Sequence, residues 1–327
     1  MPFDLPQLPE NVILEVLRNL EFREIILFSL LSTNSRKRVS SLQIKASHIN
    51  MFFHATPKIR CSFPNPSLPR ITFELPAALW KVSFKNYPAS FKLSGIQRGK
   101  CERIFTGCLK SGDLFEHLYR IFNYRREKHV VFYPGCQKVN PDLIFKDIGD
   151  VPSIIITAGS QNDNARRVLK TFKRINKLCL EINPFEDPND LQTLLTRNFY
   201  SLTLSNSMII LRLEDLLMIN AVHCSLIGCR IELRTINRFF KLWLAGSNPR
   251  LAHLKIEFPE PIPNPWMSIC GIWYQRIPED QERVVDTVGE VLWQNRIHGG
   301  FDVRRRDGRK ATFRITSTAI RLFVWMR

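Results

Sequence analysis

The cysteines and histidines are the side chains of this sequence that could bind a metal ion or act as a nucleophile with its base. The 8 cysteines are scattered, and no two of them have the CxxC separation typical of a zinc site. None of the 7 histidines is spaced for a metal. Cys101 and Cys108 precede His117, but nearness along the chain does not show that side chains meet in space. We therefore predict no metal site, no cofactor and no catalytic residue, and we expect reduced, mostly buried thiols.

Motifs of the common catalytic sites are absent as well. The sequence has no glycine-rich phosphate-binding loop, no GxSxG nucleophile elbow and no HExxH zinc motif. The absence of these motifs favours a binding protein over an enzyme.

Three consecutive arginines near the C-terminus form a second group of side chains that could bind a partner. The pair Asp307-Gly308 predicts a two-residue hairpin turn directly after them. Strand alternation then places Arg304 and Arg306 on one face and Arg305 on the other. Because a guanidinium group pairs two-fold with carboxylate or phosphate, the hairpin is a candidate surface for an acidic or phosphorylated partner. The alternative is a solvated face that only keeps the protein soluble.

The net charge of +17 belongs to the body and the C-terminal part of the chain. Residues 1–45 contain six Lys or Arg and five Asp or Glu, whereas residues 298–327 contain eight Lys or Arg and two Asp. A basic surface suits acidic partners or nucleic acid, but no nucleic-acid-binding motif accompanies it. We therefore do not expect nucleic acid as a partner, and solubility is the simpler explanation of the charge.

No segment of the sequence indicates membrane insertion or secretion. The longest apolar run near the start, Ile25 to Leu31, is too short for a membrane span. The first residues lack the positive region and the long apolar stretch of a signal peptide. We expect a protein of the cytoplasm or nucleus that does not bind a membrane.

The first forty residues have the pattern of three short helices. Apolar residues recur at helical spacing on one face of residues 10–20, and Pro9 stands at the start of that segment. Residues 23–31 are apolar nearly all round, which is typical of a helix that is buried or shared with a partner. Ser32 or Thr33 can cap a third helix at residues 34–42. Three helices of this length form a marginal core, which a partner that covers the remaining apolar surface would stabilise.

Two strings in this segment are specific: LPENVILEVLRNL at residues 8–20 and FSLLS at residues 28–32. Through these two strings, the segment resembles an F-box. The resemblance implies that residues 1–50 dock on a Skp-family adaptor and, through it, on a cullin-RING ubiquitin ligase. The residues implied at this adaptor interface are Leu8, Pro9, Ile13, Leu14, Leu17 and Leu31. The alternative, that each of them only builds the core of the helical bundle, stays open.

Short β-like runs recur through the middle of the chain at nearly constant spacing. Their last residues are Phe132, Ile156, Leu180, Leu204, Leu226 and Ile256. The first three separations are 24 residues and the next two are 22 and 30, a period in the range of leucine-rich repeats. One strand–helix unit cannot bury its own faces, but stacked units can. Asn183 and Ser207 lie where the polar ladder of such repeats would run.

We therefore predict a mixed α/β fold. A small three-helix F-box precedes a leucine-rich-repeat-like, curved α/β body that ends in a β-hairpin. Residues 233–244 are the clearest helix of the body, with apolar residues on one face and Gly246 after its end. An ordinary α/β domain is the alternative to the repeat architecture.

The most specific strings of the body are LEDLL at residues 213–217, NRFFKLWL at residues 237–244 and GSNPRL at residues 246–251. With them, residues 202–258 resemble the type 2 F-box-associated domain of the large nematode F-box family. The tail GFDVRRRDGRKATFRI at residues 300–315 resembles the same type.

The two resemblances together imply a domain organisation and a function. We expect the F-box at residues 1–50, a link or the start of the body at 51–125, and an F-box-associated, substrate-binding domain at 126–327. The implied function is a substrate-recognition adaptor of a Skp–cullin–F-box ubiquitin ligase, which recruits an unknown protein and performs no catalysis itself. The alternative is a basic module that binds protein or nucleic acid without a ligase.

Overall fold

A computed structural model describes residues 8–64, 70–74, 88–94, 102–136, 139–284 and 296–325, with the backbone alone for 88–94, 102–112 and Arg23. The chain divides into two compact units. Unit 1 comprises residues 1–154 and 159–174, and unit 2 comprises residues 155–158 and 175–327. The domain boundaries predicted after residues 50 and 125 both lie within unit 1, where they remain predictions.

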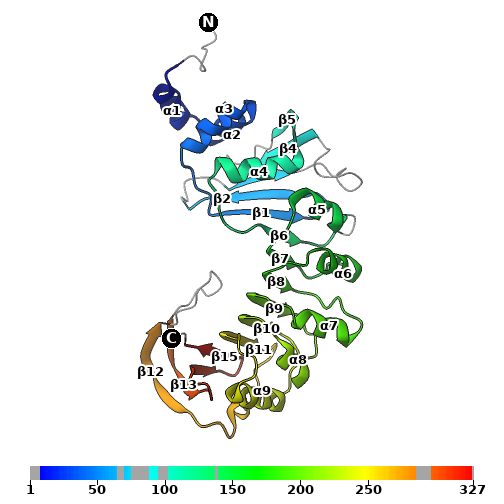
Figure 1. The fold of residues 1–327 in the computed structure, drawn as a ribbon, viewed down its shortest axis with the longest axis vertical. Helices are drawn as coiled ribbons and strands as arrows, with labels where there is room; N and C mark the ends of the chain where they lie inside the picture. Colours follow the sequence, from blue (N-terminus) through cyan, green and yellow to red (C-terminus); the bar gives the residue numbers. More distant parts are fainter. Residues whose placement is uncertain are drawn as a thin grey trace. The chain divides into compact units, whose positions relative to one another are not determined.

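Unit 1 begins with three helices, α1 (Glu10–Asn19), α2 (Phe22–Leu31) and α3 (Thr33–Ser41) (Figure 1). Each end lies within one residue of the end that the sequence predicts. Pro9 precedes α1 with φ of −53°, a value that its ring imposes. The hydroxyl of Ser32 accepts a hydrogen bond from the amide of Ser35 at 3.0 Å and so caps α3. The predicted N-terminal helical module is confirmed.

The sheet of unit 1 has an antiparallel part that the sequence analysis did not assign. The strands β1 (His48–Phe53), β2 (Lys58–Ser62), β3 (Ile71–Glu74), β4 (Pro88–Ser94) and β5 (Glu102–Lys110) pair in that order. On its other edge β1 pairs in parallel with β6 (His129–Phe132). The helix α4 (Ser111–Ile121) connects β5 to the segment before β6. Residues 51–125 thus contain strands of a sheet and the helix α4.

Unit 1 ends with elements of the strand–helix type. The helix α5 (Pro141–Ile148) leads into β7 (Ser153–Ile156), and α6 (Asn162–Thr171) follows. The side chain of Asn140 caps α5 by accepting a hydrogen bond from the amide of Asp142 at 3.1 Å. The last residues of β7, Ile155 and Ile156, belong to unit 2.

The parallel strands of unit 2 confirm the predicted repeat. They are β8 (Lys177–Leu180), β9 (Ser201–Ser205), β10 (His223–Ile227) and β11 (His253–Glu257). Leu180 pairs with Leu204, Leu204 with Leu226, and Leu226 with Ile256. The amide of Glu181 donates to the carbonyl of Ile156 at 2.9 Å, which sets Ile156 beside Leu180 in the same register. All five side chains are buried, so the period in the sequence is the period of the core.

Three helices connect these strands: α7 (Pro188–Leu195), α8 (Leu213–Met218) and α9 (Leu233–Ala245). They lie on one side of the parallel strands of unit 2 (Figure 1). The predicted helix at 233–244 is therefore correct, and Ile236, Phe239, Phe240 and Trp243 are its buried face. Gly246 ends α9 with φ of +131°, a backbone conformation that other residues rarely adopt.

The C-terminal part of unit 2 extends the sheet with antiparallel strands. After the 3₁₀ helix η5 (Pro265–Ile269), the strands are β12 (Gln275–Val284), β13 (Arg296–Arg304), β14 (Lys310–Ile315) and β15 (Ala319–Val324). β15 pairs with β11, and β14, β13 and β12 follow in that order. The predicted terminal hairpin is thus β13–β14. Across the parts of the chain that the structure describes, no helix is both long and apolar enough to cross a membrane.

Candidate interaction surfaces

The six residues implied at an adaptor interface divide into two groups in the structure. Ile13 and Leu17 are fully buried and pack inside the helical module. Leu8 and Leu14 are half-buried and Pro9 is exposed. Leu31, the last residue of α2, is 74% exposed. Four of the six side chains are therefore accessible to a partner, and two hold the helices together.

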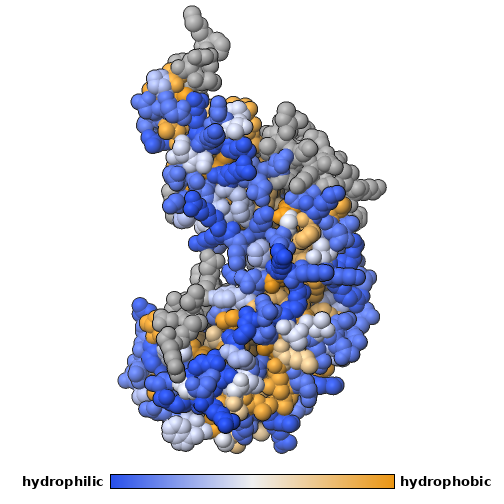
Figure 2. Space-filling view, viewed as in Figure 1, coloured by the Kyte–Doolittle hydropathy of each residue, from blue (hydrophilic) through white to orange (hydrophobic). Residues whose placement is uncertain are grey.

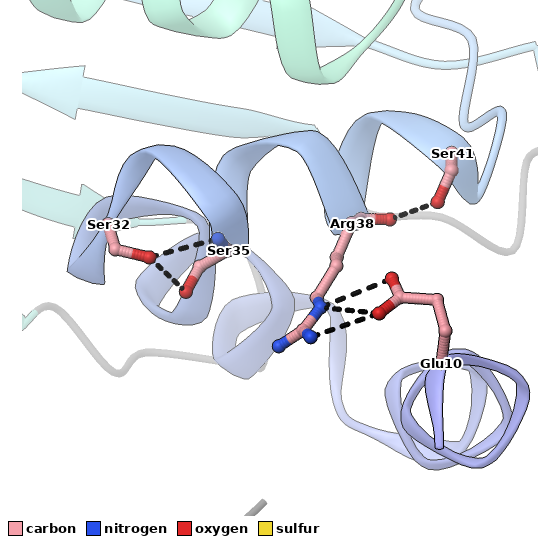
Figure 3. A network of polar contacts seen from close by, with 5 residues as sticks. All are labelled: Glu10, Ser32, Ser35, Arg38 and Ser41. Carbon is pink, nitrogen blue, oxygen red and sulfur yellow. Dashed lines mark hydrogen bonds and ion pairs between the residues drawn. The ribbon is translucent and has the colours of Figure 1, made fainter. Parts of the chain in front are cut away.

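Polar contacts fix α1 against α3 (Figure 3). The guanidinium of Arg38 donates from Nε to both carboxylate oxygens of Glu10, at 3.1 and 3.0 Å. Its Nη2 lies 2.9 Å from Oε2 of the same carboxylate. Because Glu10 is the first residue of α1 and Arg38 lies in the last turn of α3, this ion pair joins opposite ends of the module. It ties the start of α1 to the end of α3.

The helical module is also joined to the sheet part of unit 1. The hydroxyl of Ser29 lies 2.8 Å from Nε2 of His117 on α4, and both side chains are buried. Asn123 donates from Nδ2 to the carbonyl of Ser40 at 3.0 Å. Aromatic packing adds a further contact, since the ring centres of Phe22 and Phe122 lie 5.8 Å apart in a stacked arrangement. No local sequence pattern predicts these contacts, because their partners lie far apart in the chain.

At the C-terminal hairpin, the structure corrects one residue of the arginine run. Arg304 and Arg306 are exposed, as predicted, but the side chain of Arg305 is 1% exposed. Its guanidinium lies 5.0 Å from the centre of the Trp243 ring and donates to the carbonyl of Gly246. Arg305 therefore attaches the hairpin to the end of α9, and it is not available to a partner.

The hairpin turn is also longer than predicted. Arg305 still bonds Arg309, with its amide donating to the carbonyl at 2.8 Å, so the loop has three residues rather than two. Gly308 takes φ of +87° at the last loop position, where a three-residue hairpin needs a left-handed residue. Arg305 points inward because burial alternates along the chain here, with Val303 buried and Arg304 exposed before it.

A polar ladder follows the parallel strands of unit 2. Asn206 donates from Nδ2 to the carbonyl of Glu181 at 3.1 Å and accepts from the amide of Met208 at 2.8 Å. Cys229 donates to the carbonyl of Leu204 at 3.5 Å. Asn183 accepts from the amide of Phe185 at 3.3 Å within its own loop, and Asn206 takes the place predicted for Ser207, which is exposed. The ladder satisfies backbone groups at the strand ends, which is a structural role.

His223 and His253 are buried side by side on β10 and β11, in register with each other. Burial lowers the pKa of both, and that of His253 falls to about 3. Both imidazoles are therefore neutral at physiological pH. In the described ranges, no three or more His, Cys, Asp or Glu side chains come together as a potential metal site. Cys101 lies outside the described residues, and only the backbone is described for Cys108.

Comparisons with known proteins match two separate parts of this architecture. A model of the F-box domain matches residues 5–47, the segment that contains α1, α2 and α3. A model of the F-box-associated family matches residues 190–256, which run from α7 to β11. The chain carries an F-box and an F-box-associated domain. Both resemblances found in the sequence are thereby confirmed, although the matched F-box-associated segment does not reach the C-terminal hairpin.

One curated relative is an F-box associated domain-containing protein, sdz-33, of Caenorhabditis elegans. It is 24% identical to this chain over 172 residues, which are 53% of this chain and 51% of the relative. The match thus spans about half the length of each protein. No solved structure gives a significant match.

Proposed function

We propose that this protein is a substrate-recognition adaptor of a Skp–cullin–F-box ubiquitin ligase and performs no catalysis of its own. The observation that carries the proposal is the F-box match over residues 5–47, which coincides with the three-helix module. The F-box-associated domain at the other end of the chain supplies a surface for a target protein. Ubiquitin transfer then belongs to other subunits, and this chain raises the effective concentration of the target near them.

The proposed adaptor surface consists of Leu8, Pro9, Leu14 and Leu31. Ile13 and Leu17 are buried inside the helical module that carries this surface. A small interface depends on a few well-placed apolar anchors, each worth about 2 kcal/mol or more. Leu31 is the strongest candidate, because an isolated bundle gains nothing from an exposed leucine at the end of α2. Ile13 and Leu17 contribute indirectly, because their burial keeps α1 packed in the helical module.

The proposed target surface includes Arg304 and Arg306, without Arg305. Both side chains are exposed on the hairpin β13–β14, and Arg305 fixes that hairpin to α9. An acidic or phosphorylated segment of a target suits these two guanidinium groups.

Co-purification with a recombinant Skp-family adaptor tests the proposal. We expect the intact chain to bind, and we expect Leu31→Glu, or Leu8→Ala combined with Pro9→Ala, to weaken binding by about tenfold or more. The matched control is Leu242→Glu, which places the same charge on an exposed leucine of unit 2. Failure of the correctly folded intact chain to bind any Skp-family adaptor would refute the proposed function.

A further inference from the structure

A run of exposed aromatic side chains begins in the 3₁₀ helix η5 of unit 2. Trp273 is 82% exposed, and Trp266, Met267 and Tyr274 are between 38% and 49% exposed. These four residues are called here the aromatic patch. In the space-filling view, hydrophobic residues also reach the surface over the part of unit 2 that contains α8 and α9 (Figure 2). Folding does not stabilise large apolar side chains that stay in water, whereas covering them with a partner would.

Buried neighbours hold the aromatic patch in place. Ile269 and Ile272, which lie between its members in the sequence, are buried. The side chain of Asn237 on α9 donates from Nδ2 to the carbonyls of Ser268 and Cys270, at 3.1 and 2.9 Å. The segment is therefore fixed against α9 before any partner arrives, which reduces the entropy lost on binding.

A ring on the sheet joins two members of the patch. The ring of Phe301 on β13 lies edge to face with those of Trp266 and Tyr274, at 5.2 and 5.0 Å between ring centres. Phe301 is the strand partner of Phe313, which packs against Phe240 of α9. Phe301 therefore lies on the face of the sheet that α9 covers, and the three rings form one cluster beside that helix.

A row of cations runs along α9 next to the aromatic patch. Arg234, Arg238 and Lys241 are exposed, and their spacing of four and three residues puts them on one side of the helix. The amine of Lys241 reaches the segment that carries the patch, because it lies 3.3 Å from the position that a Cβ atom on Gly271 would take. The helix itself contains no Asp or Glu.

Two further cations border these elements. Arg276 is exposed on β12 and is the strand partner of Phe301, so both side chains lie on the same face of the sheet. Arg306 is exposed near the end of α9, where its amide donates to the carbonyl of Leu244 at 2.9 Å. Since Arg306 belongs to the proposed target surface, the row on α9 continues that surface toward the patch. Within the described part of the chain, none of the cations in this row or beside it forms an ion pair.

The acidic side chains near these cations do not balance them. Along β12, Glu279 pairs with Arg314 and Glu282 pairs with Arg296, each at 2.7 Å. The carboxylate of Asp307 is held by two arginines of its own hairpin, at 3.3 and 2.7 Å. The acids outside such pairs that are nearest in sequence to α9 and the patch are Glu232, Glu260 and Asp280, and they are fewer than the cations. The surface thus combines exposed aromatic rings with an excess of positive charge.

We propose that the aromatic patch and the cations along α9 bind a segment of the target protein in which a large apolar side chain stands beside Asp or Glu residues. The proposal rests on the proposed function and names a part of its target surface. The apolar side chain covers Trp273, and the acidic residues pair with Arg238 and Lys241. Arg234 and Lys241 stand about 10 Å apart along the helix axis, so acidic residues within about three positions of each other reach both.

A single-stranded nucleic acid fits this surface less well. Its successive bases stack on a series of free ring faces. The rings of Trp266 and Tyr274 already pack against Phe301, and aromatic and arginine side chains are the common anchors of protein interfaces.

Panning a phage-displayed library of random peptides against the full chain tests this inference. Each round first removes the phage that bind the Trp273→Ala chain, so that the surviving peptides require the patch. We expect them to share a large apolar residue beside Asp or Glu. A fluorescein-labelled synthetic peptide from this set is then titrated by fluorescence anisotropy. Trp273→Ala, and separately Arg238→Glu with Lys241→Glu, should weaken its binding by about tenfold or more.

Matched controls make the same kinds of change elsewhere. Met208→Ala removes another strongly exposed apolar side chain. Lys146→Glu with Lys170→Glu reverses the charge of two exposed lysines in unit 1. Both controls should bind the peptide normally. Thermal unfolding checks that every variant is folded, and Arg276→Glu replaces the double charge reversal on α9 if that variant does not fold.

Three results would overturn the inference. They are the absence of any surviving peptide, surviving peptides without acidic residues, and binding that the variants of the patch and of α9 do not change. Tighter binding of poly-dT, abolished by Trp273→Ala, would assign the surface to nucleic acid instead. Self-association in sedimentation velocity that the same variant abolishes would assign it to a second copy of the chain. The Skp-adaptor assay depends on unit 1, so its failure refutes the adaptor function, whereas a negative peptide result alone refutes this docking surface.

Discussion

The hydroxyl of Ser29 and Nε2 of His117 form a buried hydrogen bond of 2.8 Å between α2 and α4. The hydroxyl proton of Ser29 is engaged by the carbonyl of Ile26 at 2.6 Å, so His117 is the donor. This bond joins the helical module to the sheet of unit 1 across 88 residues of sequence. The module is therefore a part of unit 1, and the joint can be tested.

Ser29→Ala should destabilise unit 1 by about 1–3 kcal/mol, because it leaves a buried imidazole N–H without an acceptor. Urea unfolding followed by circular dichroism measures the loss. Ser41→Ala is the control, since the hydroxyl of Ser41 is exposed and bonds only the carbonyl of Arg38. Equal stability of the two variants would contradict the importance of the buried bond.

Stability should fall as the pH drops below about 6.5, the pKa of histidine in an unfolded chain. Burial, with help from the charges of Arg36 and Arg120, lowers the pKa of His117 in the folded protein to about 4. Between these two values the unfolded chain takes up a proton that the folded chain does not, so acid favours unfolding. The effect for His117 amounts to about 3 kcal/mol once the pH has fallen to about 4.

Urea midpoints at about pH 7.5, 6 and 5 measure this dependence. His117→Gln should reduce the slope between the two lower pH values. His48→Gln, which changes an exposed side chain, should leave the slope as it is. His253 adds to the slope in unit 2, because burial lowers its pKa to about 3.

Asn248→Ala should destabilise unit 2 by about 2 kcal/mol or more. The buried Asn248 side chain donates from Nδ2 to the carbonyls of Leu216, Leu217 and Ile219, at 3.0, 3.2 and 2.8 Å. These carbonyls lie at the C-terminal end of α8, where few helical amides remain to pair with them, although that of Leu216 also accepts from the amide of Ile219 at 3.4 Å. Thermal unfolding of Asn248→Gly separates two causes, because glycine keeps the φ of +47° but loses the amide. If the amide matters, the glycine variant is also clearly destabilised.

Arg305→Ala should destabilise unit 2, whereas Arg304→Ala and Arg306→Ala should not. Only Arg305 is buried against Trp243 and bonded to Gly246. Differential scanning fluorimetry of the three variants measures the difference. Arg304→Ser with Arg306→Ser then tests target recognition on a folded protein. Unchanged capture of the protein's partners would exclude the hairpin from the target surface.

The parts of the fold that the sequence predicts are those in which one local pattern decides the structure. In unit 2, each strand buries a residue equivalent to Leu204, so the repeat is visible as a recurring apolar run. In the helical module, helical spacing and the cap at Ser32 determine α1 and α3 almost to the residue. The antiparallel strands β2 and β3 have no such recurrence, and the sequence analysis left them unassigned.

The misjudged site residues depend on partners far away in the chain. Arg305 is held by Gly246, which is 59 residues distant, and alternation along a strand does not foresee that contact. The juxtaposition of Ile210 with Arg230 has a related origin. Ile210 and Arg230 stand in different repeats, and only the register of the parallel strands brings an apolar side chain and a cation together.

The parallel register of unit 2 also bears on how such proteins diverge. Equivalent positions on neighbouring parallel strands are occupied by Leu180, Leu204 and Leu226. Each of these strands bonds only the strands next to it in the sheet. A duplication or deletion that spans one whole repeat leaves every remaining strand with the neighbour it requires. An insertion of any other length fits only in the loops at the strand ends, because within a strand it would break this register. The number of repeats can therefore change without altering the strand pairing inside the repeats that remain.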